Sequence, residues 1–305
     1  MSQQISEAFV MQYNANVFHL SQQKGSKLQP YVRNETQNGK SQFWDRIGAV
    51  SAVKKVGRHS STPQFDTPHS RRMVVMEDYE WADLVDEEDK IRMLMDPTSE
   101  YAMAAAWALG RAKDDVIIAN AIGNAYSGES GATPVALPDT QKFAANNGSA
   151  FTNLNVNTLR KVKKMFMANE VDSSIPLYMA CSASQIESLL GQTEVTSSDY
   201  NTVKALVQGD VDTFMGFKFI PLERLTTASV TASATTGIVG SGTTATGRQC
   251  IAWAQDGVMM VTGKDITTEI DKLPTKSYST QVYAKQSIGA TRMEEVKVVN
   301  VICTE

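Results

Sequence analysis

The longest regular pattern of apolar and polar positions runs from Asp96 to Ala125. Asp96 can cap a helix whose first residue is Pro97, and Glu100 adds negative charge to the first turn. Nine alanines favour helix formation and leave a surface that another element can approach closely. The pattern predicts a helix roughly 40 Å long, which is longer than a small compact domain needs.

Downstream of this helix the apolar spacing alternates between the helical and the strand period. It predicts an amphipathic helix at 155–171 with Leu159, Val162 and Phe166 on one side, a buried strand at 175–182, and short helices at 182–191 and 197–209. It also predicts an uncharged surface loop at 226–247, a hairpin at 248–264 that turns at Gln255–Asp256–Gly257, and two terminal strands at 278–305 that break near Gly289.

The N-terminal part of the chain has a different character. Residues 1–45 are rich in Gln, Asn, Ser and Lys, with only scattered apolar residues, so they cannot form a core of their own. Either they are a frayed terminus or they are an arm that folds by lying across another surface, and the apolar residues favour the arm. Residues 44–75 predict a long β-hairpin, and Pro63 and Pro68 exclude its middle from central strand pairing.

Charge divides this region into two blocks. The hairpin is basic, and the segment that follows it is acidic. The basic residues are Arg46, Lys54, Lys55, Arg58, Arg71 and Arg72, and the acidic residues are Glu77, Asp78, Glu80, Asp83, Asp86, Glu87, Glu88 and Asp89. Such blocks are often only solvated faces, but a protruding basic hairpin beside an acidic segment also suits subunits that dock onto one another.

Composition limits the classes of protein that fit. The 305 residues are 42% apolar and 20% charged, and the net charge is −4, so a globular core is expected and tight non-specific nucleic-acid binding is not. Cys181, Cys250 and Cys303 are far apart in sequence, which argues against a zinc site or a disulfide scaffold. With no visible secretion signal and no apolar run of about 20 residues, the sequence predicts a soluble intracellular product with no membrane contact.

The sequence offers only weak candidates for catalytic or metal-binding residues. His59 and His69 flank Asp66, but ten residues separate the histidines and no further ligand of suitable type is near in sequence. The neighbours Asp114 and Asp115 point about 100° apart on a helix, so they do not form a shared-proton pair. No phosphate loop, dinucleotide fingerprint or nucleophile elbow is present. We therefore expect no enzymatic activity, no catalytic residues, no metal site and no cofactor.

The order of these elements resembles that of the major capsid proteins of tailed double-stranded DNA bacteriophages (Caudoviricetes), whose α+β fold is called Hong Kong 97-like. The stretches that carry the resemblance are TPHSRRMVVMEDYEWADLVDEEDKIRMLMDPTSEYAMAAAWALGRAKDDVIIANAIGNAYSGESG, TEVTSSDYNTVKALVQGDVDTFMGFKFI and KSYSTQVYAKQSIGATRMEEVKVVNVICTE. Together they cover much of the chain in order, which makes the match more specific than a short motif.

The resemblance implies named parts. They are an N-terminal arm at 1–45, an extended loop at 46–80, a peripheral domain at 81–150 with the spine helix at 96–125, an axial domain at 151–264, and return strands of the peripheral domain at 265–305. In this interpretation the basic residues of the extended loop contact the acidic residues of a neighbouring subunit. The apolar residues Val53, Val56, Phe65 and Val74 join that contact.

The resemblance also implies a function. The chain would be a structural major head protein that self-assembles into hexamers and pentamers of an icosahedral shell in the virion, after synthesis in the host cytoplasm. Its expected partners are other copies of itself, a separate scaffolding protein, a portal protein at one vertex, a possible decoration protein, and packaged DNA through weak non-specific contact. A lysine–asparagine cross-link has no identifiable partner residues here.

Three rival interpretations remain open at this point. An encapsulin-like nanocompartment shell shares the fold but carries enzyme cargo. A cytoplasmic enzyme built on residues 151–264 requires a pocket with converging titratable groups, for which the sequence supplies no candidates. A tail or head-completion protein forms rings of fixed number and no closed shell.

Overall fold

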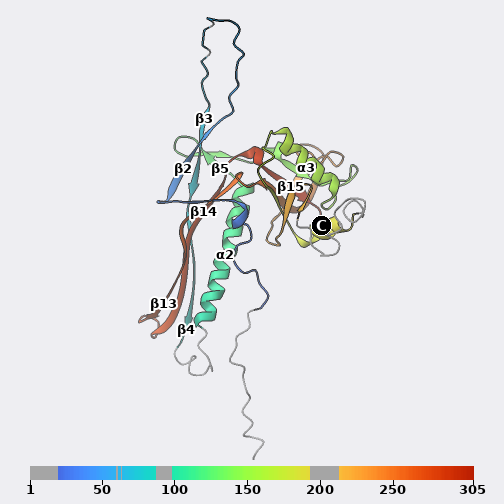
Figure 1. Ribbon diagram of the computed structural model, residues 1–305. Coiled ribbons are helices and arrows are strands. Elements are labelled where there is room, and N and C mark those ends of the chain that lie inside the picture. The colour runs from blue at the N-terminus through green and yellow to red at the C-terminus, as the bar shows by residue number, and fades with distance from the viewer. Residues whose placement is uncertain (1–19, 60, 63, 87–97, 193–212) are drawn as a thin grey trace, which may run out of the picture. The chain divides into compact units, whose positions relative to one another are not determined.

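The computed structural model describes residues 20–59, 61–62, 64–86, 98–192 and 213–305 (Figure 1). They form two compact units. The first draws its described residues from Met1–Ser26, Asp78–Ala112 and Lys264–Ser287, and the second from Lys27–Glu77, Lys113–Gly263 and Ile288–Glu305. The fold is α+β, as the sequence predicts.

A seven-stranded sheet is the largest element of the second unit. Its order is β7–β15–β12–β8–β10–β9, and β11 pairs with β12. The strands are β7 (Lys142–Ala144), β8 (Leu177–Cys181), β9 (Thr213–Phe214), β10 (Phe217–Pro221), β11 (Thr227–Ala232), β12 (Thr243–Ala254) and β15 (Val298–Cys303). The strands β8 and β15 are buried along their whole length, which fits central positions in the sheet.

Two helices of the second unit agree with the periodicity of the sequence. In α3 (Val156–Ala168), Leu159, Val162 and Phe166 are buried, and the Phe166 ring lies 6.1 Å from that of Phe217 on β10. Asn155 caps α3 by accepting a 2.7 Å hydrogen bond from the Thr158 amide. The shorter α4 (Ala183–Leu190) has Gly191 as its C-cap residue. The predicted helix at 197–209 lies outside the described residues.

The base of the hairpin belongs to a second sheet, in the order β2–β3–β5–β6. It comprises β2 (Ser41–Ile47), β3 (His69–Val75), β5 (Ala125–Ser127) and β6 (Thr133–Val135). Val74 of β3 is buried against Met259, Val261 and Met293, and Trp44 of β2 packs on the same cluster. This apolar cluster fixes the base of the hairpin to the second unit.

The third sheet, in the order β1–β13–β14–β4, has residues in both units. It comprises β1 (Arg33–Thr36), β4 (Glu77–Val85), β13 (Val258–Leu273) and β14 (Ser279–Arg292). In the first unit, Ala105 and Leu109 of α2 (Thr98–Ile122) pack with Ala284 of β14. The alanines thus allow the close approach that the sequence indicates. The short 3₁₀ segments are η2 (Gln29–Tyr31), η3 (Asp139–Gln141) and η4 (Glu295–Lys297).

The helix α2 is shorter than the predicted 96–125. Ile122 is its last residue, and the proposed cap at Asp96 and Pro97 lies outside the described residues. At the other end, the Gly123 amide donates to the Ala119 carbonyl at 2.8 Å. Ala125 already belongs to β5, so the alanine-rich composition continues past the end of the helix.

Three local predictions were wrong because strand partners are set by distant residues. Half of the uncharged segment 226–247 is paired strand, since β11 and β12 run antiparallel from Thr227↔Arg248 to Ala232↔Thr243. The turn at Gln255–Gly257 exists, but β12 and β13 join different sheets instead of forming a hairpin. The strand β14 continues through Gly289, where a Cβ would lie 2.5 Å from the Val75 carbonyl oxygen.

The described part of the predicted arm lies on its own chain. In the second unit, the buried carboxylate of Asp114 accepts hydrogen bonds of 3.0–3.1 Å from the amides of Lys27 and Leu28. The Tyr31 carbonyl accepts a 3.0 Å bond from the indole of Trp253, and β1 pairs in parallel with β13. For residues 27–36, the surface on which the predicted arm lies therefore belongs to the same chain.

A glycine contact in the first unit is testable. A Cβ at Gly110 of α2 would lie 2.5 Å from the Cα of Gly25. We expect Gly110→Ala to destabilise the protein by about 1–3 kcal/mol, because the overpacking outweighs the better helix propensity of alanine. Thermal or denaturant unfolding measures the change.

Gly57→Ala is the matched control, because nothing lies within 4 Å of a Cβ at that position. Its effect should stay within about 0.5 kcal/mol. Equal stability of Gly110→Ala and the parent would show that the segment around Gly25 does not pack on α2.

Candidate assembly surfaces

The hairpin ladder stops well before the tip of the hairpin. β2 and β3 are antiparallel from Ser41↔Val75 to Ile47↔His69, and the Gly48 amide donates to the Pro68 carbonyl at 2.8 Å. Beyond that bond, the described residues between 49 and 67 form no strand, and we call residues 49–67 the ribbon. Figure 1 shows its two sides running on from the ends of β2 and β3 as an open loop.

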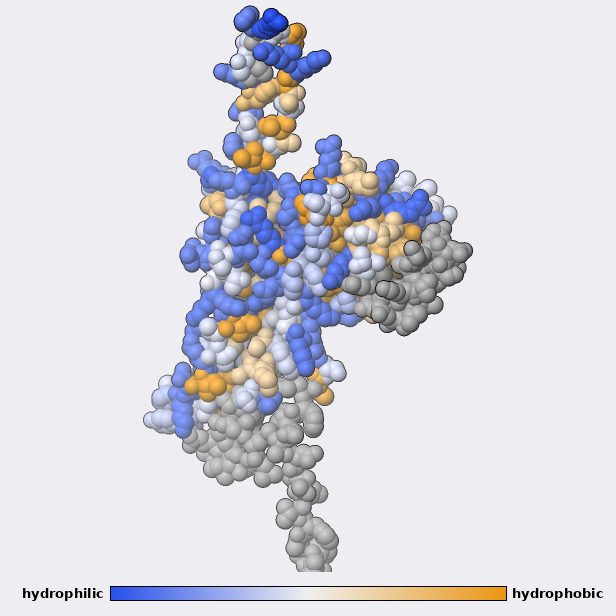
Figure 2. Space-filling model, viewed as in Figure 1, coloured by the Kyte–Doolittle hydropathy of each residue, from blue (hydrophilic) through white to orange (hydrophobic). Residues whose placement is uncertain are grey.

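The ribbon exposes large apolar side chains. Val50, Val53, Val56 and Phe65 are 62%, 59%, 94% and 51% exposed, and the space-filling view shows apolar atoms among hydrophilic ones along it (Figure 2). Val74, which the sequence grouped with them, is instead buried at the hairpin base. Apolar side chains so exposed on an extended segment indicate a surface that another chain covers.

The six basic residues divide into an exposed and an inward-facing set. Lys54, Lys55 and Arg58 lie exposed on the ribbon. The guanidinium of Arg71 pairs with Asp45 at 3.1 Å and lies 5.5 Å from the Phe43 ring, and it stays partly exposed.

Arg46 and Arg72 correct the prediction of one exposed basic set. Arg72 is buried and pairs with Glu295, and Arg46 donates to the Met293 carbonyl. Successive residues of a strand point to opposite faces, so Arg71 faces outward while Arg72 faces inward. Charge reversal at Arg72 would therefore disrupt a buried ion pair of the subunit itself.

The acidic residues line the outer face of β4 in the first unit. Asp78 accepts a hydrogen bond from Ser287, and Glu80 accepts one from the Tyr283 hydroxyl at 3.0 Å. The latter bond raises the pKa of Tyr283. Asp86, just after the strand, accepts a bond from Ser279. Asp83 has the alternate parity, that of Tyr79 and Trp81, and its carboxylate accepts a 2.8 Å bond from the Leu84 amide.

Glu77 is exposed in the second unit, and Glu87, Glu88 and Asp89 lie outside the described residues. The side chains of Tyr79 and Trp81, which alternate with the acids of β4, pack on the alanine cluster of α2. The strand therefore offers one carboxylate-rich face.

The histidines do not gather into a reactive site. His59 is exposed on the ribbon, and His69 lies at the start of β3 beside an open hollow that Asp45, Arg71 and Glu129 also line. Across the described ranges, no three or more of His, Cys, Asp and Glu are grouped so that they could hold a metal ion. Likewise, no helix in these ranges is long and apolar enough to cross a bilayer.

The sequence did not indicate that the three cysteines are neighbours. Cys181, Cys250 and Cys303 are free and buried on β8, β12 and β15 of the same sheet. A hydrogen bond with Cys303 and burial raise the pKa of Cys250, and burial raises that of Cys181. Thiols kept protonated in this way act as small apolar side chains in the sheet.

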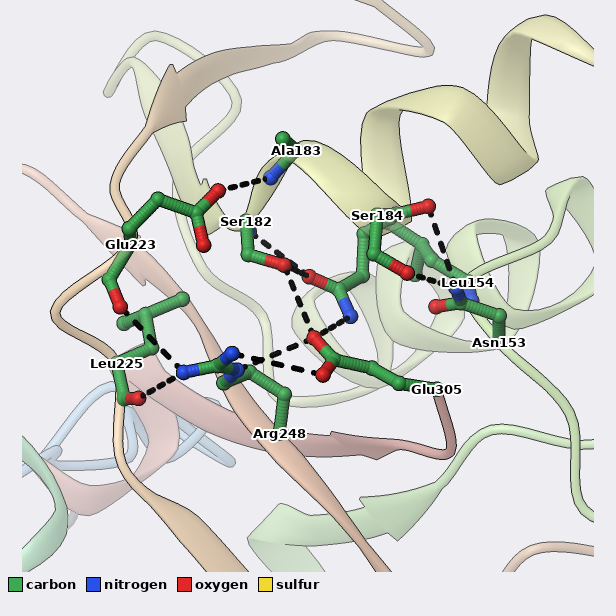
Figure 3. A network of polar contacts seen from close by, with 10 residues as sticks. Asn153, Leu154, Ser182, Ala183, Ser184, Glu223, Leu225, Arg248 and Glu305 are labelled. Carbon is green, nitrogen blue, oxygen red and sulfur yellow. Dashed lines mark hydrogen bonds and ion pairs between the residues drawn. The ribbon is translucent and has the colours of Figure 1, made fainter.

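A polar network at the start of α4 was also not predicted (Figure 3). The Glu305 carboxylate accepts bonds from Ser182 and Gln185 at 3.1 and 3.2 Å and pairs with Arg248 at 3.1 Å. The Glu223 carboxylate accepts a 2.6 Å bond from the Ala183 amide. These bonds hold β15, β12 and α4 together, and the hydrogen bond from Arg248 lowers the pKa of Glu305.

Asp114 and Asp115 point in different directions, as their adjacent helical positions predict. Asp114 holds the backbone of residues 27 and 28, while Asp115 forms a two-point ion pair with Arg224, with Nε to Oδ1 at 2.7 Å. Both carboxylates therefore have structural partners.

Comparison with protein families gives one match, which covers almost the whole chain. Residues 5–305 match the family described as "Phage capsid protein". No curated protein matches the chain.

Solved structures with similar folds are capsids or heads of phages. The capsid of cyanophage P-SCSP1u superposes with a TM-score of 0.74 at 15% identity, covering 99% of this chain and 94% of that chain. The capsid of Ralstonia phage GP4 gives 0.74 at 8% identity, covering 97% and 96%. The head of Helicobacter pylori bacteriophage KHP40 gives 0.72 at 10% identity, covering 99% and 98%. At such identities the likeness shows the fold, which is Hong Kong 97-like, as the order of elements in the sequence predicts.

The network at α4 predicts a pH effect on stability. Because the folded state holds the pKa of Glu305 below its ordinary value of 4.5, this carboxylate stabilises the protein above that pH. The contribution is lost as the pH falls from about 4.5 through the lower folded-state pKa. We expect Glu305→Gln to lose at most about 1 kcal/mol at pH 7, since the ion pair is partly exposed.

Denaturant unfolding at pH 7 and at pH 3 measures this effect. The difference between the parent and Glu305→Gln should shrink at the lower pH. Glu170→Gln, at an exposed acid next to the end of α3, is the control. A difference that stays constant with pH would contradict the assigned role of the Glu305 carboxylate.

Proposed function

The chain belongs to the phage capsid protein family, and from this premise we propose that its copies assemble as hexamers and pentamers into an icosahedral shell around packaged double-stranded DNA. The chain is a structural major capsid protein of the virion, and its family role is not enzymatic. The encapsulin-like alternative is not favoured, because the family match is to phage capsid proteins.

The observation that carries the proposal is the exposed ribbon. The hydrogen-bond ladder ends at Gly48 and Pro68, and four large apolar side chains beyond it face solvent. An extended loop of this kind is marginally stable in water, and it gains stability when its backbone and apolar side chains contact a second surface. In a shell of identical subunits, that surface belongs to a neighbouring copy.

Charge indicates which surface of a neighbouring copy the ribbon would contact. Lys54, Lys55 and Arg58 stand exposed on the ribbon, and the carboxylates of β4 form an exposed face. We propose that ribbon cations of one copy approach the β4 carboxylates of the next. Each exposed ion pair contributes only about 0–1 kcal/mol, so many equal contacts in a closed shell are required for a large total.

Further partners follow from the proposed shell and not from any single contact. Assembly in the host cytoplasm with a separate scaffolding protein, a portal protein at one vertex and a possible decoration protein belongs to this proposal. So does weak, non-specific contact with DNA, which suits a chain whose net charge is −4.

Apolar substitutions on the ribbon test the docking. We expect Val53→Asp with Val56→Asp to block shell formation and leave the subunit folded, because both side chains are exposed and contribute no packing within the subunit. Electron microscopy scores shells, and circular dichroism scores folding. Ser51→Ala on the same ribbon is the control and should assemble. Normal shells from the double variant would contradict the docking of the ribbon.

Charge exchange tests the proposed ionic contact. We expect Lys54→Glu with Lys55→Glu to slow assembly at low salt, because the ribbon then repels the acidic face. Adding Glu80→Lys, on the exposed carboxylate face of β4, should restore part of the rate. Light scattering follows assembly at about 0.05 and 0.5 M salt, since the higher salt screens exposed charges. Rate changes independent of salt and without rescue would exclude this pairing.

A further inference from the structure

Three arginines converge on one carboxylate beneath the hairpin base. Arg46 of β2 and Arg72 of β3 lie on the same face of the ladder, because Arg46 pairs with Ser70 and Trp44 pairs with Arg72. Arg292 is the last residue of β14, and Glu295 follows it at the start of η4. All four residues belong to the second unit.

Glu295 is shared among the three guanidinium groups. One of its oxygens pairs with Arg72 and lies 3.8 Å from Nε of Arg292, while the other lies 3.9 Å from Nη1 of Arg46. The Met293 carbonyl accepts a bond from Arg46 and a longer one, 3.5 Å, from Nε of Arg72. The single carboxylate of Glu295 is therefore shared by three guanidinium groups.

Arg292 is the best satisfied of the three. Its Nη groups donate to the carbonyls of Ala121, Gly123 and Val135 at 3.0, 2.7 and 2.8 Å. The Ala121 and Gly123 carbonyls lie at the C-terminal end of α2, where the helix dipole favours a cation. This position explains why Arg292 is fully buried at that site.

The described residues supply no second carboxylate for the remaining positive charge. Among the described residues, the buried atoms Nη1 of Arg72, Nε of Arg46 and Nε of Arg292 have no hydrogen-bond partner. Arg72 itself is 1% exposed. Burial lowers the pKa of Arg72, and the nearby charge of Arg46 lowers it further. Buried guanidinium N–H groups without acceptors are costly, so an acceptor at this place would stabilise the fold.

We propose that Arg46 and Arg72, backed by Arg292, form a binding site for a small oxyanion of the phosphate or sulfate class. Guanidinium groups present planar, paired N–H donors that match two oxygens of such an anion. The side chains of Arg46 and Glu295 are 21% and 20% exposed, so the site opens to solvent at that rim.

The bound anion would act on the hairpin. It would bridge β2 and β3 at the base of the ribbon and hold them to the chain segment 292–295. The site needs residues of one chain only, so it stands independently of how neighbouring copies dock. Anion binding would stiffen the base from which the ribbon extends.

Equilibrium dialysis of the full-length chain against radiolabelled inorganic phosphate tests the site, with ionic strength held constant by chloride. We expect saturable binding of about one phosphate per chain. Arg46→Met should weaken it about tenfold, the effect of losing one charge-assisted contact. Arg160→Met, at an exposed residue of α3, should leave it unchanged.

If Arg46→Met fails to fold, phosphate binding to Glu295→Gln tests the site instead. This substitution keeps the shape of the side chain and removes the carboxylate that competes for the guanidinium groups, so phosphate should bind about tenfold more tightly. No saturable binding, or unchanged or weaker binding to folded Glu295→Gln, would overturn the proposal. Equal weakening by Arg160→Met would also overturn it, because binding would then reflect general positive charge.

Discussion

The proposed assembly depends on the point at which the hydrogen-bond ladder between β2 and β3 ends. Up to the bond between Gly48 and Pro68, the two strands satisfy each other and Val74 fastens them to an apolar cluster. Past that bond, the ribbon has apolar side chains in solvent and no described strand pairing. Water can form hydrogen bonds with its backbone, but exposing its apolar side chains to water is unfavourable. A neighbouring subunit would remove those side chains from water. A monomeric role gives these exposed side chains no purpose, whereas a capsid shell does.

The chain is less dependent on neighbours than its composition indicates. The polar segment before the hairpin has no core of its own, yet Asp114 and Trp253 hold its backbone to the body, and β1 joins a sheet. Buried hydrogen bonds to its backbone, together with the buried side chains of Leu28 and Val32, fix this mostly polar segment. The ribbon, and not the described part of the arm, is therefore the element for which we propose a partner in a neighbouring copy.

Predictions from sequence succeeded where the signal is local and failed where it depends on distant partners. The helix α3, the buried strand β8 and the closure of α4 at Gly191 follow from apolar period and caps. The opposite directions of Arg71 and Arg72 depend on which face of β3 meets residues 293–295, more than 200 positions away, and the strand character of 227–232 depends on pairing with β12. The order of elements identified the fold, and the division into peripheral and axial domains stays a prediction.

The central claim is that the ribbon is completed by another copy of the chain. Hydrogen–deuterium exchange of the amides of residues 49–67, compared between the unassembled subunit and the purified shell, measures this directly. The account predicts rapid exchange in the subunit and strong protection in the shell, with the already paired amides of β2 and β3 protected in both. Equally rapid exchange of the ribbon in intact shells would contradict it.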